Sequence, residues 1–188
     1  MTKDIWVISD THFSHENIIK YCDRPFTDRD YMDEHMIDKW NSVVKPGDKV
    51  YHLGDVYMGE GGQERFAKIA PRLLGQKRLI LGNHDNGKDK LLQSVFQKIG
   101  VWRMFSEFGL LLTHVPVHPS SLTRIERKAK WSNDDQKYLV EATTYNLKNI
   151  HGHTHTNAEP DGDTKNYKCV CVELIDYTPV HIEELRIK

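Results

Sequence analysis

Cysteine is scarce in this sequence of 188 residues, which contains only Cys22, Cys169 and Cys171. So small and odd a number excludes a disulfide framework and indicates free thiols in a reducing compartment. Long apolar runs are also lacking: no stretch approaches the roughly 18 residues of a membrane span, and no apolar signal region precedes Ile5. We therefore expect a cytoplasmic protein without a membrane segment.

An excess of charge is lacking as well. Lys and Arg number 26 and Asp and Glu 27, so the formal net charge is −1, and global charge indicates no polyanionic partner. The 38% hydrophobic and 28% charged residues are those of an ordinary globular protein. A chain of this length can bury a substantial core, and no linker, repeat or low-complexity tract divides it. We expect a single domain over residues 1–188.

What the sequence does have is a series of short apolar runs that end in metal-binding residue types. Five fragments occur at such ends, namely Asp10-Thr11-His12, Gly54-Asp55, Gly82-Asn83-His84-Asp85, Thr113-His114 and Gly152-His153-Thr154-His155. In open α/β sheets, ligand sites lie at the carboxyl ends of the strands, so we expect these side chains on one rim. Carboxylate, imidazole and amide oxygen form a donor set that suits Mn, Fe, Ni or Zn, and thiolate is absent from the set.

Helical patterns separate the apolar runs. Met32, Met36 and Trp40 recur at helical spacing after an N-cap at Thr27 or Asp28. Similar patterns predict two further helices and two closing strands: residues 63–74 and 88–99 for the helices, and residues 167–174 and 180–187 for the strands. Strands that alternate with helices indicate an α/β architecture whose strands are largely buried.

The five fragments, in this order, resemble the calcineurin-like metallophosphoesterases. The resemblance implies an α/β fold, a four-layer αββα sandwich with two mixed β-sheets and the metal site at the C-terminal ends of the strands. It also implies seven ligands: Asp10, His12 and His155 for a first metal, Asn83, His114 and His153 for a second, and Asp55 bridging both. A bridge needs a carboxylate, because its charge offsets the repulsion of two cations about 3.5–4 Å apart. We expect two divalent ions, Mn before Fe, Ni, Zn or Co.

The sequence alone does not fix the orientation of the histidines around Gly152. In an extended segment His153 and His155 would share a face, whereas a turn would let them diverge toward separate metals, as the resemblance implies. His151 is either a donor behind the ligands or a packed strand residue, and we favour packing.

The resemblance implies hydrolysis of a phosphate ester by a water that two divalent ions activate. We assign His84 to the leaving-group side, as a general acid or a donor to phosphate, and expect Asp85 to orient it. Asp85 is equally suited to cap a following helix. Asn83 and His84 together are the expected contacts to the substrate at this loop.

Further candidates lie outside the ligand set. His15 either contacts phosphate or lies in the first turn of a helix. Arg24 carries a guanidinium suited to bidentate phosphate binding, with a surface ion pair as the alternative. His52 is interpreted as structural.

A local basic cluster over residues 124–131 has two interpretations. It is either a lid that contacts nucleotide or nucleic-acid phosphate, with Trp131 stacking on a base, or a solvated helical face with one buried tryptophan. We favour the solvated face, because runs of charge usually serve solubility. The loop over residues 59–62 is a second candidate for controlling access to the rim.

We therefore expect a dinuclear-metal-dependent phosphodiesterase that hydrolyses a small nucleotide-type phosphate ester. A phosphomonoesterase or nuclease of the same family is the enzymatic alternative, and a non-catalytic protein-interaction scaffold is the alternative of another class. The scaffold is disfavoured because all seven ligand types and the pair His84 and Asp85 are present. Nucleic acid is not favoured, since the chain lacks an added domain for a long duplex, and no oligomeric state is predicted.

Overall fold

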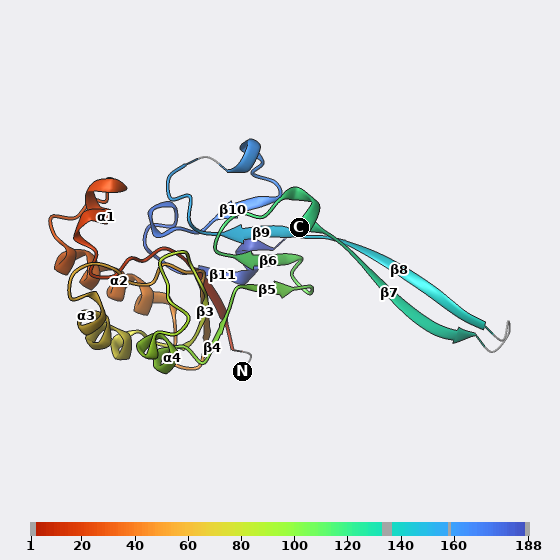
Figure 1. Ribbon diagram of the computed structural model, residues 1–188, viewed down its shortest axis with the longest axis horizontal. Helices are drawn as coiled ribbons and strands as arrows, with labels where there is room; N and C mark the ends of the chain where they lie inside the picture. The colour runs from red at the N-terminus through yellow and green to blue at the C-terminus, as the bar shows by residue number, and fades with distance from the viewer. Residues whose placement is uncertain (1–2, 133–136, 158, 187–188) are drawn as a thin grey trace.

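The computed structural model describes residues 3–132, 137–157 and 159–186. Two β-sheets lie together, helices cover one of them, and a long hairpin leaves the body as an arm (Figure 1). The first sheet has five strands in the order β11 (Val180–His181), β1 (Ile5–Ile8), β2 (Lys49–His52), β3 (Gln76–Ile80) and β4 (Lys98–Gly100). The second has four, in the order β10 (Tyr167–Cys169), β9 (Lys148–His151), β6 (Leu110–Thr113) and β5 (Trp102–Phe105).

Both sheets are mixed. In the first, β1 to β4 run parallel and β11 is antiparallel to β1. In the second, β10, β9 and β6 run parallel and β5 is antiparallel to β6. The carboxyl ends of the parallel strands therefore lie together at one edge of each sheet. The predicted α/β sandwich with two mixed sheets is confirmed.

Two apolar cores hold the layers together. Between the sheets, Val7, Leu53 and Ile80 pack in one cluster with Leu112 and Ile150. The second core lies between the first sheet and the helices α2 (Arg29–Val43), α3 (Gly62–Ile69) and α4 (Lys90–Val95), which cover its outer face (Figure 1). Burial of this apolar surface is the main contribution to the stability of the layers.

Helix α2 begins where the sequence predicts. The Asp28 carboxylate accepts a hydrogen bond of 2.8 Å from Tyr31 N, which satisfies one free amide of the first turn. Met32, Met36 and Trp40 are buried along its inner face. The remaining helical elements are short: α1 (Glu16–Tyr21), α5 (Ile182–Leu185) and the 3-10 helices η1 (Ala70–Arg72), η2 (Pro119–Leu122), η3 (Pro160–Gly162) and η4 (Val172–Leu174). Among the described residues no helix combines the length and apolarity needed to cross a bilayer.

The two other predicted helices are shorter than expected. Helix α3 ends at Ile69, because Pro71 follows and the chain continues as η1. Helix α4 ends at Val95, and the predicted helix over residues 88–99 is wrong in its last part. Ile99 lies in β4, where parallel pairing with β3 overrides the helical spacing of the apolar residues.

The two predicted closing strands are also interrupted. The first keeps three residues as β10 and then turns into η4. The second keeps Val180 and His181 as β11, after which the His181 side chain accepts a hydrogen bond from Glu183 N and starts α5. A local cap therefore ends the second strand early, whereas η4 follows the first strand without a side-chain cap.

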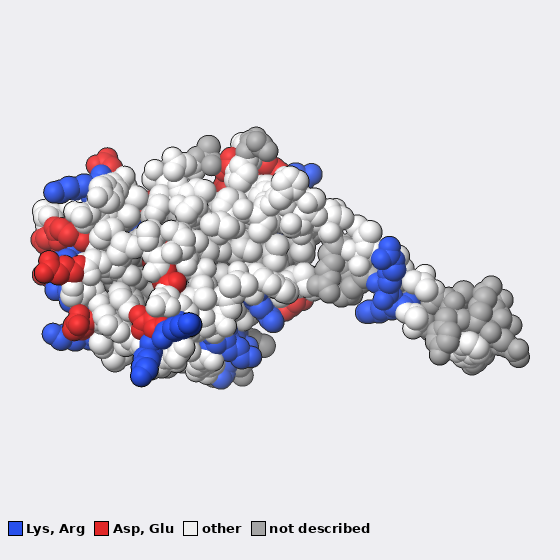
Figure 2. All heavy atoms as spheres, viewed as in Figure 1, with Lys and Arg blue, Asp and Glu red and all other residues white. Residues whose placement is uncertain are grey.

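The arm is the hairpin of β7 (Thr123–Ser132) and β8 (Lys137–Asn146). The two strands pair antiparallel along their whole length, from Thr123 opposite Asn146 to Ser132 opposite Lys137. The predicted helical face over residues 124–131 is therefore wrong. The arm stands clear of the body, and Lys and Arg side chains gather partway along it (Figure 2).

Strand alternation gives the arm one mostly apolar face, which Arg127 interrupts. Ile125, Ala129 and Trp131 lie on the same face of β7, and Val140 lies opposite Ala129 on β8. Trp131 is 49% exposed, so the expected burial of this tryptophan is wrong.

Candidate metal centre

The loops that follow the strands hold the predicted ligands on unusual backbone. Left-handed φ angles occur at Asp10 (57°), His12 (47°), Asp55 (56°), His153 (68°) and His155 (49°). Residues other than glycine rarely adopt left-handed φ angles, although Asp, Asn and His do so more readily than other residues. Such strain concentrates at functional sites, where the surrounding structure maintains it.

Two glycines let these loops approach one another. A Cβ atom on Gly82 would lie 2.1 Å from Asp55 Oδ1, and one on Gly152 would lie 2.1 Å from Asp10 Oδ2. Backbone hydrogen bonds of 3.0 Å then join the first two loops, from Asp10 N to Gly54 O and from His12 N to the carbonyl of Asp55. The loops after β1, β2, β3 and β9 thus form one rim.

The first ligand cluster consists of Asp10, His12, His155 and Asp55. Asp10 Oδ1 lies 3.9 Å from His12 Nε2 and 3.7 Å from His155 Nε2, and His12 Nε2 lies 3.6 Å from Asp55 Oδ2. Among the described residues, Asp10 Oδ1 and both ring nitrogens of His12 are buried without a hydrogen-bond partner. Two ligands that each lie about 2.0–2.2 Å from one ion are separated by such distances. The orphaned atoms therefore fit a metal ion.

Protonation in the chain without metal differs among the three residues Asp10, His12 and His155. Burial lowers the pKa of His12 to about 2, so its ring is neutral and offers a lone pair. Burial raises the pKa of Asp10. For His155, burial lowers the pKa, but hydrogen bonds to Cys22 and Glu173 outweigh it and raise the pKa to about 10. A metal ion at His155 must therefore displace a proton.

The second cluster consists of Asp55, His114, Asn83 and His153. His114 Nε2 lies 3.5 Å from Asp55 Oδ2 and 2.8 Å from Asn83 Oδ1, and His153 Nδ1 lies 2.9 Å from the same Asn83 oxygen. His114 Nδ1 donates to the Leu53 carbonyl at 2.8 Å, which turns Nε2 toward the cluster.

Asp55 joins the two clusters. Its Oδ1 accepts a hydrogen bond of 2.9 Å from His84 N, whereas its Oδ2 faces His12 on one side and His114 on the other. The turn at Gly152 also separates His153 and His155, so that each contributes to a different cluster. The structure thus brings together all seven residues that the sequence offered as ligands.

His84 and Asp85 take different roles from those expected of a pair. The His84 ring is exposed at the rim, with its centroid 5.8 Å from that of His12. The Asp85 carboxylate accepts hydrogen bonds from the backbone N of Asp55 (2.8 Å), Val56 (3.1 Å) and Gly82 (2.8 Å). The expectation that Asp85 orients His84 is corrected, because its carboxylate fixes the loop of Asp55. It does not cap α4 either, since Asp89 does so.

Arg24 does not lie where a substrate would reach it. The side chain is buried and donates to the carbonyls of Asp10 and Thr11, each at 2.8 Å, and to Glu173 Oε1. The expectation of phosphate binding by Arg24 is therefore corrected: its guanidinium fixes the backbone of the first metal loop. His15 does lie at the site, with its ring centroid 5.7 Å from that of His12.

Two histidines and one glutamate support the ligands from behind. His52 is buried, accepts from Gly54 N and contacts Thr11 Oγ1 at 2.9 Å, as its structural interpretation predicts. His151 is buried in β9 with Nε2 2.7 Å from Glu159 Oε2. Glu173 was missed by the sequence analysis. It accepts from His155 Nδ1 at 2.9 Å, and only the folded chain shows this contact.

Two thiols lie closer to the ligands than the sequence suggests, because Cys22 is hydrogen-bonded to His155 and Cys171 approaches Asp10. Cys171 Sγ is 3.2 Å from Asp10 Oδ2, the oxygen that faces away from His12 and His155. Burial raises the pKa of this thiol, so it stays protonated and donates to the carboxylate. Thiol sulfur therefore lies beside the carboxylate and imidazole donors of the first cluster.

A shared carboxylate between two ligand clusters, at the strand ends of a two-sheet α/β sandwich, defines the class of metal-dependent phosphoesterases. The calcineurin-like phosphoesterase family matches residues 3–170, and the chain belongs to this family.

Three similar proteins have names that state no activity. An uncharacterised protein of Methanocaldococcus jannaschii is 32% identical over 96% of this chain and 88% of its own length. The gene 66 protein of Mycobacterium phage L5 is 30% identical over 80% of this chain and 77% of its own. A crystal structure of a protein of unknown function from Aquifex aeolicus superposes with a TM-score of 0.71, at 26% identity and 98% coverage of both chains.

Proposed function

We propose that this chain is a dinuclear-metal-dependent phosphodiesterase that acts on small nucleotide-type phosphate esters. The observation that carries the proposal is the Oδ2 atom of Asp55, which lies 3.6 Å from His12 Nε2 and 3.5 Å from His114 Nε2. Two divalent ions, Mn by preference, would supply Lewis acidity and an activated water when bound on either side of it.

The residues around the clusters supply the proton chemistry. His84 is exposed beside His12, and its backbone N is held by Asp55 Oδ1, so its ring is placed to protonate a leaving alkoxide. His15 lies on the same side of His12. Burial, followed by the charge of Arg24, lowers the pKa of His15, which suits a neutral donor to a phosphate oxygen.

The charge around the site supports a diester over a monoester. A phosphodiester carries one negative charge near neutral pH, whereas a monoester carries nearly two. The Arg24 guanidinium is already paired with Glu173 and with backbone carbonyls. It therefore cannot neutralise the second negative charge of a phosphomonoester.

The test is hydrolysis by the full chain after removal of metal with a chelator and addition of Mn. We expect methyl 4-nitrophenyl phosphate to be cleaved only with Mn. For methyl phenyl phosphate, whose leaving group needs a proton, His84→Ala should reduce kcat by about 100- to 10,000-fold, and the loss should be much smaller for the 4-nitrophenyl ester. His181→Ala, a histidine at the far edge of the first sheet, is the control and should retain the rate.

Other outcomes would replace the proposal. Cleavage of 4-nitrophenyl phosphate alone would identify a phosphomonoesterase, and cleavage of single-stranded DNA alone a nuclease. Mn binding measured by calorimetry without hydrolysis of any of these esters would indicate a scaffold.

A further inference from the structure

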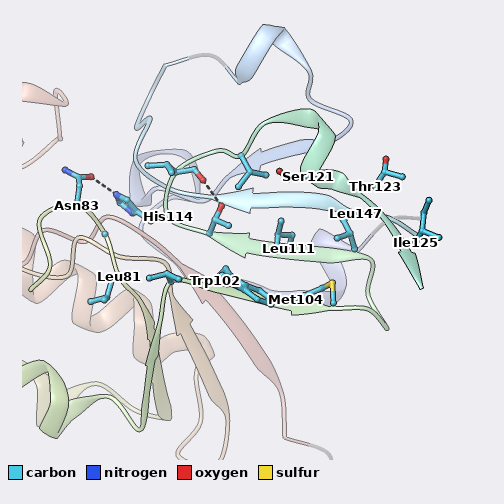
Figure 3. Close-up of a pocket in the computed structure, with 15 residues that line it drawn as sticks. Leu81, Asn83, Trp102, Met104, Leu111, His114, Ser121, Thr123, Ile125 and Leu147 are labelled. Atoms are coloured by element: carbon cyan, nitrogen blue, oxygen red, sulfur yellow. Dashed lines mark hydrogen bonds between the residues drawn. The ribbon is translucent and has the colours of Figure 1, made fainter. Parts of the chain in front are cut away.

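An apolar groove runs from the second ligand cluster to the base of the arm (Figure 3). Its volume is about 820 Å³, within the range of about 300–1,000 Å³ for small-molecule sites. Asn83 and His114 lie at one end, and Thr123 and Ile125 of β7 lie at the other. Trp102 of β5 lies between the two ends.

The groove keeps large apolar side chains in contact with water. Val101 is 66% exposed, Trp102 59% and Val115 46%. An exposed apolar patch of this kind in a concave surface marks a place where a ligand or partner is bound. The groove is continuous with a catalytic site, so the occupant that its position indicates is part of the substrate.

The lining also selects by charge. Among the described residues that line the groove, none is Asp, Glu, Lys or Arg. A substituent with a second phosphate would enter this apolar space without a positive partner, which is unfavourable. The groove therefore fits an uncharged group and disfavours a nucleic-acid strand or a polyphosphate chain.

The shape and polarity of the lining favour a flat ring over an alkyl chain. The Trp102 indole offers an aromatic face, and stacking on aromatic side chains is how proteins bind bases of any sequence. Ser121 and Thr123 lie at the end away from the metal ligands (Figure 3) and offer hydroxyls to the polar edge of a base. A saturated alkyl chain could not form hydrogen bonds with these hydroxyls.

The position of the groove distinguishes the two substituents of a diester. Asn83 and His114 of the second cluster line it, whereas His84 and His15 lie beside His12 of the first cluster. If His84 protonates the leaving group, that group departs on the side of His12. The groove then holds the substituent that is retained on phosphorus.

We propose that the groove binds the retained substituent of a phosphodiester, a flat and uncharged aromatic group such as a nucleobase, with Trp102 stacking on the ring. This proposal rests on the proposed function and narrows it to nucleoside esters with a single phosphate. A monoester has no second substituent and leaves the groove empty.

The test compares three diesters with the same 4-nitrophenol leaving group, in the Mn-loaded full chain. These are the methyl ester, the n-octyl ester and the 5′-ester of thymidine. We expect the KM of the thymidine ester to be about tenfold or more below that of the methyl ester, as one base–aromatic stack provides. Calorimetric titration with thymidine 5′-methylphosphonate and with methyl methylphosphonate gives a readout that does not require turnover.

Two pairs of variants separate the groove from general effects. Trp102→Ala should remove the advantage of the thymidine compounds in both assays, whereas Tyr31→Ala, another exposed aromatic outside the groove, should retain it. Ile125→Ser should weaken the advantage, whereas Val140→Ser, on the same face of the arm but outside the lining, should not.

The outcomes separate the two proposals. Equal KM values for the methyl and thymidine esters, with equal phosphonate affinities, would overturn the proposal that the groove binds a nucleobase. The diesterase proposal would be unaffected. A lower KM for the octyl ester than for the thymidine ester would replace the aromatic occupant by an alkyl chain. Failure to hydrolyse any diester would overturn the diesterase proposal. In that case the groove proposal would still be supported if the thymidine phosphonate bound more tightly than the methyl phosphonate and Trp102→Ala abolished the difference.

Discussion

At the scale of single residues, Asp10 shows how a proposed metal ligand is held inside the protein. Its side chain is fully buried, and Oδ1 faces His12 and His155 at distances too long for hydrogen bonds. Burial raises its pKa, which reflects the unfavourable placement of an unpaired carboxylate in a low-dielectric interior. A cation would satisfy this oxygen, so affinity for metal and instability without metal have the same origin.

Asp10→Asn is therefore expected to stabilise the metal-free protein. The change removes a buried negative charge whose Oδ1 has no hydrogen-bond partner, while the remaining oxygen still accepts from His153 N. Asn also tolerates the left-handed φ of 57°. We expect urea denaturation with a chelator present to show a free energy of unfolding higher by about 1–3 kcal/mol.

The control is Asp33→Asn. Both oxygens of Asp33 accept hydrogen bonds from Ser14, so this change should destabilise the protein. An Asp10→Asn variant that is no more stable than the parent would show that the buried oxygen is not strained.

Arg24 gives a second residue-scale prediction. Lys at this position lacks the planar fork that reaches the carbonyls of Asp10 and Thr11 together with Glu173. We expect Arg24→Lys to weaken Mn binding by about 10- to 100-fold in calorimetry, with an unchanged KM for methyl 4-nitrophenyl phosphate at saturating Mn.

The exposed Arg72→Lys, which only loses its two parallel hydrogen bonds to Glu34, should change neither value. A raised KM with normal Mn affinity would instead return Arg24 to the phosphate-binding role that the sequence suggested.

At the scale of elements, His52 joins the loops after β1 and β2. Burial lowers its pKa to about 3, against an ordinary value of 6.5. The unfolded chain takes up a proton below pH 6.5 and the folded chain does not, so stability present above pH 6.5 is lost as the pH falls toward 3. This single proton corresponds to about 1.4 kcal/mol per pH unit.

Replacement of His52 by Gln should make the acid loss of stability shallower by that amount. Urea denaturation of metal-free protein between pH 6 and 4.5 measures the slope. The exposed His118→Gln serves as the control and should keep the parent slope. Identical slopes in the His52 variant would mean that the ring is protonated in the folded state.

The arm provides the second element-scale prediction. In the part of the chain that the structure describes, β7 and β8 form a two-stranded sheet of their own. Replacing residues 127–142 by Asn-Gly leaves Glu126 opposite Thr143 and closes a two-residue hairpin. We expect the same midpoint of thermal unfolding by circular dichroism and the same hydrolysis of the methyl ester, because Ile125 and the body are retained. A lower midpoint would show that the outer arm supports the body.

At the scale of the whole molecule, the ligands could be predicted from sequence and their supports could not. Asp10 and Asp55 follow strand ends, and the carboxyl ends of neighbouring parallel strands meet by topology alone. The contact between Arg24 and Glu173 joins residues 149 positions apart, and no local pattern indicates it. The groove likewise combines several elements.

Other errors arose where two patterns competed. The segment over residues 88–99 has helical spacing, yet Ile99 pairs in β4. In β7, Ile125, Ala129 and Trp131 lie at even spacing, which is a strand pattern, although Arg127 interrupts it and the run of basic residues is equally typical of a solvated helical face. In residues 88–99, pairing with β3 outweighs the helical spacing. In β7, the strand period of two outweighs the expectation of a helix.

The arm also bears on how this protein behaves in concentrated solution. In the described part of the chain, β7 and β8 pair only with each other, so each leaves the backbone groups of its outer edge open to another strand. Such edges invite polymerisation unless charge keeps neighbours apart. Arg127 and Lys128 are exposed along this ribbon. We therefore expect the basic cluster that first suggested phosphate contacts to keep the open edges of neighbouring β-ribbons apart.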